Sequence, residues 1–213
     1  MSHIISVIGT EAFVEEKSDS YGSDIMNQIS DWWEDEVENS DDDYDASFTY
    51  IYSPTIPESA IEDADSLSER RREADDWLEE NYNNYDNRAS IQILDWVGKS
   101  GDDWPIGNAS VGVALQDTAY KTGITDVAYF EDPAHFFSEV EEYGTVFHEL
   151  LHNYSVLHEH GAVNASNNTS FILSAGKDED DDSCYWIGDP NQRTDWMSTC
   201  SESEVHNHVD DNT

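Results

Sequence analysis

The chain has 213 residues, of which 48 are Asp or Glu and 9 are Lys or Arg, and its formal net charge at pH 7 is -39. This charge excludes nucleic-acid backbones and anionic membrane surfaces as partners, because both carry the same sign and would be repelled. Seven Trp, eleven Tyr and seven Phe argue against the disorder that high charge otherwise predicts, so we expect one folded, monomeric domain from a very salty environment.

The N-terminal residues M-S-H-I-I-S-V-I-G-T lack the charged start and the long apolar core of a signal peptide. No apolar run reaches the 18 residues that a transmembrane helix needs. We therefore expect either a chain that stays inside the cell or, as the favoured prediction, a secreted mature domain whose leader has been removed. A disulfide between Cys184 and Cys200 would favour export, and two buried free thiols are the alternative.

The first half of the chain alternates predicted strands and helices. Hydrophobic spacing predicts strands at Ile4 to Thr10, Ser47 to Ser53 and Ala89 to Val97, and helices at Tyr21 to Glu38 and Pro57 to Tyr82. Ser23 or Asp24 is the predicted N-cap of the first helix. In the second helix, Arg70, Arg71 and Arg72 are interpreted as surface partners of nearby acids rather than as ligand-binding residues.

Two further strands are predicted at Ala109 to Gln116 and Asp126 to Phe130, followed by a helix from about Pro133 to Tyr154. A final helix, Ser201 to Val209, has a capping-box start, and its His206 and His208 are interpreted as surface residues. Alternating strands and helices of this kind imply an α/β layer with a largely parallel sheet.

The stretch F-H-E-L-L-H-N-Y-S-V-L-H-E-H, residues 147 to 160, carries the chemistry. His148 and His152 are four residues apart, so on a helix they point the same way and can bind one divalent ion. Glu149 between them could hold a water molecule against that ion. His158 follows after enough residues to turn the chain and bring back a third imidazole, and His160 competes with it for that position.

These residues resemble the metzincin signature H-E-x-x-H-x-x-G-x-x-H. Asn153 and the acidic Glu159 are most similar to the reprolysin (adamalysin) branch, whereas Ser155 stands where the family has glycine. The resemblance implies a twisted five-stranded, mostly parallel sheet with one antiparallel edge strand and two long helices beside the metal helix. It also implies an upper subdomain over residues 1–158 and a small irregular lower subdomain over 159–213 that ends in a helix.

The resemblance further implies a single catalytic zinc ion held by His148, His152 and His158, with Met197 packed beneath these ligands. The strand at Ala109 to Gln116 would pair with an extended peptide or protein substrate. The acidic run at 41–45 does not match the spacing of a calcium loop, so calcium is unsupported.

We therefore predict a zinc endopeptidase in which Glu149 is the general base for attack by metal-activated water. A non-catalytic metal-binding or adhesion-type domain with a structural zinc site is the alternative. The intact Glu149 argues against it, because a structural site has no use for a general base. A third reading, with a downstream Glu as third ligand as in the gluzincins, is disfavoured by the register of His158.

Overall fold

The computed structural model describes residues 3–38, 44–99, 107–109, 121–128, 139–157, 163–164, 169–170, 192–193, 197 and 199–212. Helices and strands alternate through the first half of the chain, as the hydrophobic spacing predicted. In chain order the elements are β1 (His3–Thr10), α1 (Glu11–Glu16), α2 (Asp19–Trp33), the π-helical η1 (Glu34–Glu38), β2 (Ala46–Ile56), η3 (Glu58–Ala60), α3 (Leu67–Asn81), η4 (Tyr85–Asn87), β3 (Ser90–Asp95), β4 (Gly107–Ala109), β5 (Thr122–Asp126), α4 (Glu139–Asn153), β6 (Val163–Asn164), β7 (Thr169–Ser170), β8 (Gln192–Arg193) and α5 (Thr199–Asn212).

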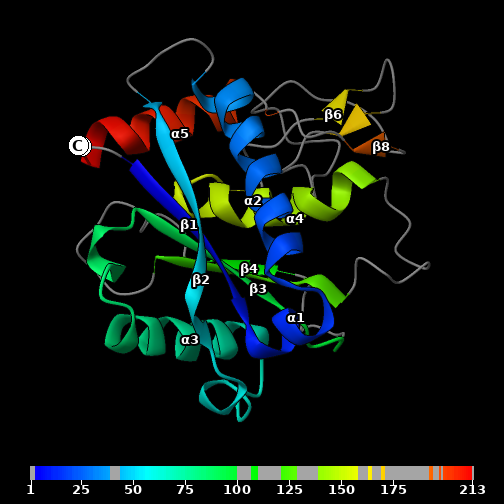
Figure 1. Cartoon of the computed structure of the whole chain (residues 1–213). Coiled ribbons are helices and arrows are strands. Elements are labelled where there is room, and N and C mark those ends of the chain that lie inside the picture. The colour runs from blue at the N-terminus through cyan, green and yellow to red at the C-terminus, as the bar shows by residue number, and fades with distance from the viewer. Residues whose placement is uncertain are drawn as a thin grey trace.

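The central sheet has the strand order β2-β1-β3-β5-β4. The first four strands in this order are parallel, and the short β4 pairs antiparallel with β5. Both faces of the sheet are covered, since α3 lies on one side and α2 and α4 lie on the other (Figure 1). This double cover explains why β1 and β3 are buried along almost their whole length instead of alternating between apolar and polar residues. The α/β prediction with a parallel sheet is confirmed.

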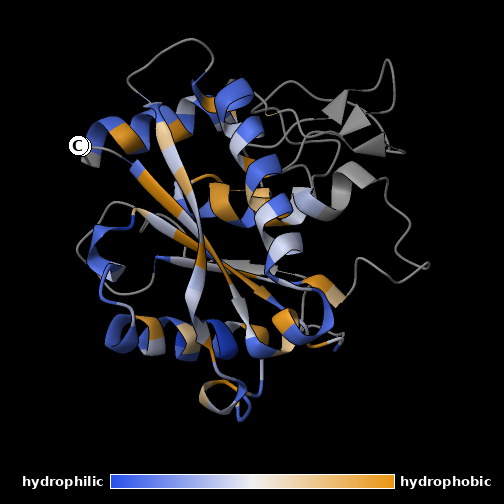
Figure 2. Cartoon of the chain, viewed as in Figure 1, coloured by the Kyte–Doolittle hydropathy of each residue, from blue (hydrophilic) through white to orange (hydrophobic). Residues whose placement is uncertain are grey.

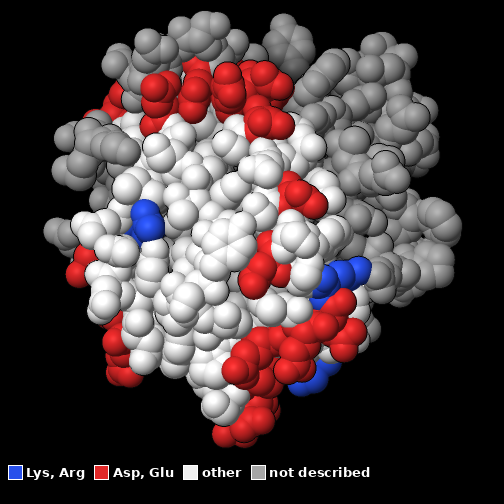
Figure 3. Space-filling view, viewed as in Figure 1, with Lys and Arg blue, Asp and Glu red and all other residues white. Residues whose placement is uncertain are grey.

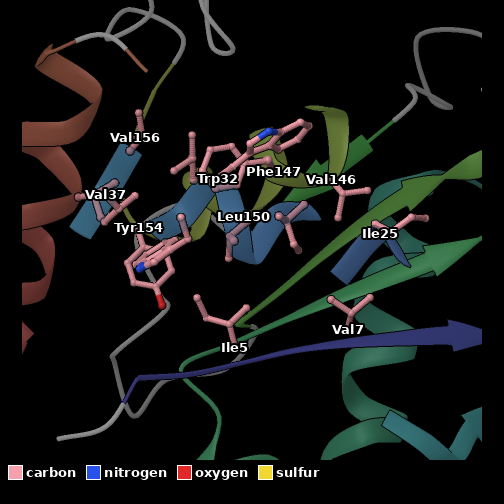
Figure 4. Close-up of a cluster of buried hydrophobic side chains, with 14 of the residues drawn as sticks. Ile5, Val7, Ile25, Trp32, Val37, Val146, Phe147, Leu150, Tyr154 and Val156 are labelled. Atoms are coloured by element: carbon pink, nitrogen blue, oxygen red, sulfur yellow. The ribbon is translucent and has the colours of Figure 1, made fainter. Parts of the chain in front are cut away.

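The hydrophobic core is divided by the sheet into two clusters. Strand β3 separates them through its alternation, because Ile91 and Ile93 face the α3 side whereas Leu94 faces the side of α2 and α4. Figure 2 shows the central strands as largely hydrophobic, while the helices are hydrophilic with interspersed hydrophobic residues. Figure 4 shows the cluster between the sheet and α4, where Phe147, Leu150 and Tyr154 approach Trp32 and Ile5. Helix α4 is therefore held by its apolar face.

The helices α2 and α3 begin at other residues than predicted, because serine side chains outside the predicted start positions cap them. The N-cap of α2 is Ser18, whose side chain accepts a hydrogen bond from Tyr21 N, and a separate helix α1 precedes it. Only a short 3-10 turn follows Pro57, and α3 begins at Leu67. Ser66 caps that helix by accepting from Glu69 N at 3.1 Å, which is the pairing that the sequence S-x-x-E indicates.

The predicted strand Asp126 to Phe130 is displaced, because Asp126 ends the strand β5 rather than beginning one. Its carboxylate accepts hydrogen bonds from the backbone of Val97 at 2.9 Å and Gly98 at 2.8 Å, so the side chain caps the loop after β3. Gly123 lies within β5, and a glycine in this place made the strand hard to predict from the sequence. A Cβ at this residue would lie 2.3 Å from Oε1 of Gln92, so the close approach of a buried side chain requires glycine.

The predicted edge strand Ala109 to Gln116 meets the described residues only at Ala109, which belongs to β4. Residues 110–120 and 129–138 lie outside the described ranges, as do residues 41–43 of the acidic run at 41–45. The final helix was predicted at Ser201 to Val209, and α5 extends it at both ends.

The interpretation of the three arginines as surface residues is wrong for Arg70 and Arg71, which are 3% and 6% exposed. Arg70 forms a buried ion pair through Nε with Asp95, and its Nη2 lies 2.8 Å from both carboxylate oxygens of Glu58. The helix α3 turns these residues toward β3 and β5, which a linear sequence of three arginines does not reveal. Arg72 remains on the surface, with Nη2 3.9 Å from Glu69.

Acidic side chains form patches on the surface of the molecule, between areas of uncharged side chains (Figure 3). Figure 3 shows Asp and Glu gathered near the top and the bottom of the view, with few Lys and Arg among them. None of the helices in the described ranges combines the length and the apolar character that crossing a membrane requires.

Candidate metal centre

Helix α4 carries the motif because its apolar residues form a stripe along the face that packs on the core. This stripe contains Val146, Phe147, Leu150, Leu151 and Tyr154, all fully buried. The spacing is that of one helix face. The intervening His148, Glu149 and His152 consequently lie beside this stripe, where they are positioned by a helix that cannot rotate without exposing its apolar residues.

The two predicted histidine ligands converge. Nε2 of His148 lies 2.9 Å from Nε2 of His152. Two Zn–N bonds of about 2.0–2.1 Å at a tetrahedral angle would place these nitrogens about 3.3 Å apart, so a shift of about 0.4 Å suffices to admit the ion. The donor type, the common direction and the spacing therefore all fit a zinc site.

The tautomer of His152 is set by the backbone. Its Nδ1 lies 2.6 Å from the carbonyl oxygen of Val156. A carbonyl can only accept, so Nδ1 carries the proton, and in the neutral ring the Nε2 lone pair points toward His148. A backbone carbonyl in this role is a frequent second partner of zinc-binding histidines, because it orients the ring and raises its basicity.

Glu149 is 6% exposed. Burial raises the pKa of its carboxyl group to about 8, and the nearby guanidinium of Arg71 lowers that pKa in part. Arg71 itself is buried and donates to Oγ1 of Thr122 at 3.3 Å. The general-base candidate therefore lies in a place shielded from bulk water, where a neighbouring cation would favour its ionised form.

The end of α4 is a Schellman motif with Ser155 at the left-handed position. Ser155 N donates to His152 O at 3.0 Å and Val156 N donates to Leu151 O at 3.2 Å. Ser155 has φ 67°, which is the conformation expected at the glycine position of the metzincin signature. A non-glycine residue there costs on the order of 1 kcal/mol. The motif presents the carbonyl of Val156 to the ring of His152.

Asn153 joins the end of α4 to the sheet. It is fully buried, and its Nδ2 donates to Oγ of Ser90 at 2.7 Å. The same hydroxyl accepts from Nε2 of Gln92 at 3.0 Å. Sequence reasoning missed Ser90 and Gln92, although two polar residues that alternate within an apolar strand are a signal of a buried polar contact.

The other predicted site residues are described only in part. Met197 is buried in the same cluster as Phe147 and Leu150, and its backbone N–H donates to Oε2 of Glu36 at 2.9 Å. Cys200 is disulfide-bonded, whereas Cys184 lies outside the described residues.

His158 and its competitor His160 also lie outside the described residues. Within the described ranges, no group of three or more His, Cys, Asp or Glu side chains is arranged to hold a metal ion. The described part of the centre therefore consists of two histidines and the glutamate between them.

The interpretation of His208 as a surface residue is wrong. It is 6% exposed, and its Nδ1 lies 2.6 Å from Oγ of Ser155. His206 is half-buried, with Nε2 2.7 Å from the carbonyl oxygen of Val37 and its ring stacked on Tyr44. Both histidines anchor α5 to the rest of the domain, which only the packing of the final helix could reveal.

Comparisons with known proteins agree with the fold. No protein-family model and no curated protein matches the chain. Among solved structures, the chain is similar to the crystal structure of archaemetzincin from Methanopyrus kandleri, with a TM-score of 0.54 and 11% sequence identity over 98% of this chain and 96% of that chain. At this identity the similarity concerns the fold, which is that of an archaemetzincin-like α/β domain.

Proposed function

We propose that this protein is a zinc-dependent endopeptidase. The observation that carries the proposal is the 2.9 Å approach of the Nε2 atoms of His148 and His152, with Glu149 buried between them on one helix. Support also comes from the similarity of the fold to archaemetzincin, whose name places it among the metzincins. His158 is proposed as the third ligand in preference to His160, on the register of the motif.

Zinc, when bound, supplies a Lewis acid that lowers the pKa of water and polarises a peptide carbonyl. The carboxylate of Glu149 accepts the proton of the attacking water and returns it to the departing amine. His152, with its proton held on Nδ1 by Val156, keeps Nε2 available as a ligand.

The proposed substrate is an extended stretch of a peptide or protein. Strand β4 supports this assignment, because it is the last strand in the order of the central sheet and pairs antiparallel with β5 along one edge. Its other edge is the one to which an extended peptide backbone could bind. The substrate backbone would add there as a further strand. Met197, buried with Phe147 and Leu150, is proposed to support the ligands from below.

We further propose that the chain belongs to the reprolysin-like branch, that it is secreted as a monomer and that it works at high salt. The acidic surface supports the salt requirement, since a net charge of -39 repels itself when ions do not screen it. The proposed division is an upper subdomain over residues 1–158 and a lower subdomain over 159–213.

The test compares Glu149→Gln and Glu149→Ala with the wild type in molar potassium chloride, after reconstitution with one equivalent of zinc. Loss of the general base should lower the turnover of casein or a peptide library at least about 100-fold while the bound zinc stays at one equivalent. Glu80→Gln, an exposed carboxylate on α3, is the matched control. Equal turnover in Glu149→Gln would refute the assigned role.

Measurements of zinc retention distinguish the peptidase from the non-catalytic metal-binding domain, and they identify the third ligand. A wild-type chain that holds zinc but cleaves no peptide would favour the non-catalytic metal-binding domain. We expect His158→Ala to weaken zinc retention more than His160→Ala does, measured by competition with a chromogenic chelator. The opposite order would move the third ligand to His160.

A further inference from the structure

The turn that follows the metal helix is tied to the C-terminal helix by one hydrogen bond. Oγ of Ser155, in the left-handed position of the Schellman motif, lies 2.6 Å from Nδ1 of His208 in α5. The next residue, Val156, provides the carbonyl that holds the ring of His152. Two contacts therefore connect α5 to the second histidine of the proposed metal centre.

The side chain of His208 is fixed by its surroundings. Its ring packs edge-on against Tyr154 with centroids 5.8 Å apart, and Tyr154 packs against Trp33 at 4.9 Å. Burial lowers the pKa of His208, so the neutral ring is favoured. A rigid neutral imidazole in this place holds the hydroxyl of Ser155 in one direction, and a fixed side chain restricts the backbone that carries it.

Glycine would adopt the conformation of Ser155 without assistance, whereas serine adopts it against a steric preference. The hydrogen bond to His208 offsets that preference, because it is available only when the turn has its observed shape. Ser155 thus requires a hydrogen-bond partner on α5, and His208 provides it.

We propose that His208 is a positioning residue for the metal centre, acting through Ser155 and the carbonyl of Val156 to orient His152. The inference rests on the proposed function for the identity of the metal. It predicts that zinc affinity depends on the docking of α5 at this turn, although no residue of α5 need touch the ion.

The experiment measures zinc affinity by chelator competition in molar salt for the wild type, His208→Ala, His208→Asn and Ser155→Gly, and for the double variant Ser155→Gly with His208→Ala. We expect His208→Ala to lower the affinity about 10-fold, as is usual for residues that orient a metal-binding histidine. Asparagine places an amide near the position of Nδ1. His208→Asn should therefore keep a zinc affinity within about threefold of the wild type, a smaller change than the loss of an orienting contact causes.

The double variant separates positioning from packing. With glycine at position 155 the turn no longer needs the hydrogen bond to His208. The added His208→Ala change should therefore alter zinc affinity by less than about threefold, well below the loss of about 10-fold expected for His208→Ala alone. His206→Ala is the matched control, because it removes the hydrogen bond to Val37 from the same helix without touching Ser155. An equal loss in both backgrounds, or an equal loss from His206→Ala, would overturn the proposal.

A metal-free readout keeps the two proposals distinguishable. Hydrogen exchange of the amides of Ser155 and Val156, which bond to His152 and Leu151, should be faster in metal-free His208→Ala than in the wild type. Unchanged exchange overturns the role of His208 even if the protein proves to be a zinc peptidase. Faster exchange in a chain that binds no zinc refutes the proposed function and keeps the coupling between α5 and the turn.

Discussion

Replacing Arg70 with alanine should destabilise the fold more than any surface substitution in α3. The guanidinium is 3% exposed and bonds to Asp95, to Glu58 and, through Nη1 at 2.9 Å, to the carbonyl of Ile61. Asp95 is fully buried, and its Oδ1 also accepts from Thr10 at 2.8 Å. Removing the arginine leaves this carboxylate buried without its counter-charge.

The expected cost is about 3–5 kcal/mol, the usual effect of breaking a buried ion pair by removing one partner. For a chain of this size each 1 kcal/mol lowers the melting temperature by about 2–4 °C, so the loss should be about 6–20 °C. Circular dichroism during heating in molar salt measures it. Because the pair is shielded from solvent, the difference between variant and wild type should change little with salt concentration.

Arg72→Ala is the matched control, since Arg72 is exposed on the same helix and its pairing with Glu69 is 3.9 Å long. Its cost should lie below about 0.5 kcal/mol. Equal melting temperatures for the two variants would refute the assignment of a buried ion pair. A double variant, Arg70→Met with Asp95→Asn, should recover part of the loss, because it removes the uncompensated charge.

Two further predictions concern pH and salt. Burial raises the pKa of Asp75 from 3.8 to about 6, so its contribution to stability is fully present below about pH 4 and is lost as the pH rises through 6. Asp75→Asn should therefore gain about 3 kcal/mol on the wild type between these pH values in denaturant titrations, and a constant difference would contradict the shift. Dilution of salt should reduce the helical circular dichroism of the wild type, because its charge of -39 is then unscreened, and an unchanged spectrum would contradict salt adaptation.

Much of the fold could be predicted from the sequence because hydrophobic periodicity is a local property. The strand β1 and the helix α2 follow from runs such as I-I-S-V-I and from apolar residues at helical spacing. Boundaries failed where a single polar side chain decided them. Asp126 ends β5 by accepting from the loop after β3, and that contact joins residues far apart in the chain.

The same distinction applies to the site. The spacing of His148 and His152 sufficed to predict that they share a face, since four residues return to nearly the same direction on a helix. The 2.9 Å approach of their Nε2 atoms agrees with that prediction. The hydrogen bond between Ser155 and His208 could not be predicted, because 53 residues separate the two and no local pattern links them.

The sequence by itself determined the α/β class and the face shared by the two histidines. Each of these depends on residues within one or two turns of a helix or strand. Only the tertiary structure decided that Arg70 is buried while Arg72 is exposed, and that His208 contacts Ser155 in the turn after α4. Burial and long-range hydrogen bonds depend on which surfaces meet when the sheet, α3, α4 and α5 pack together.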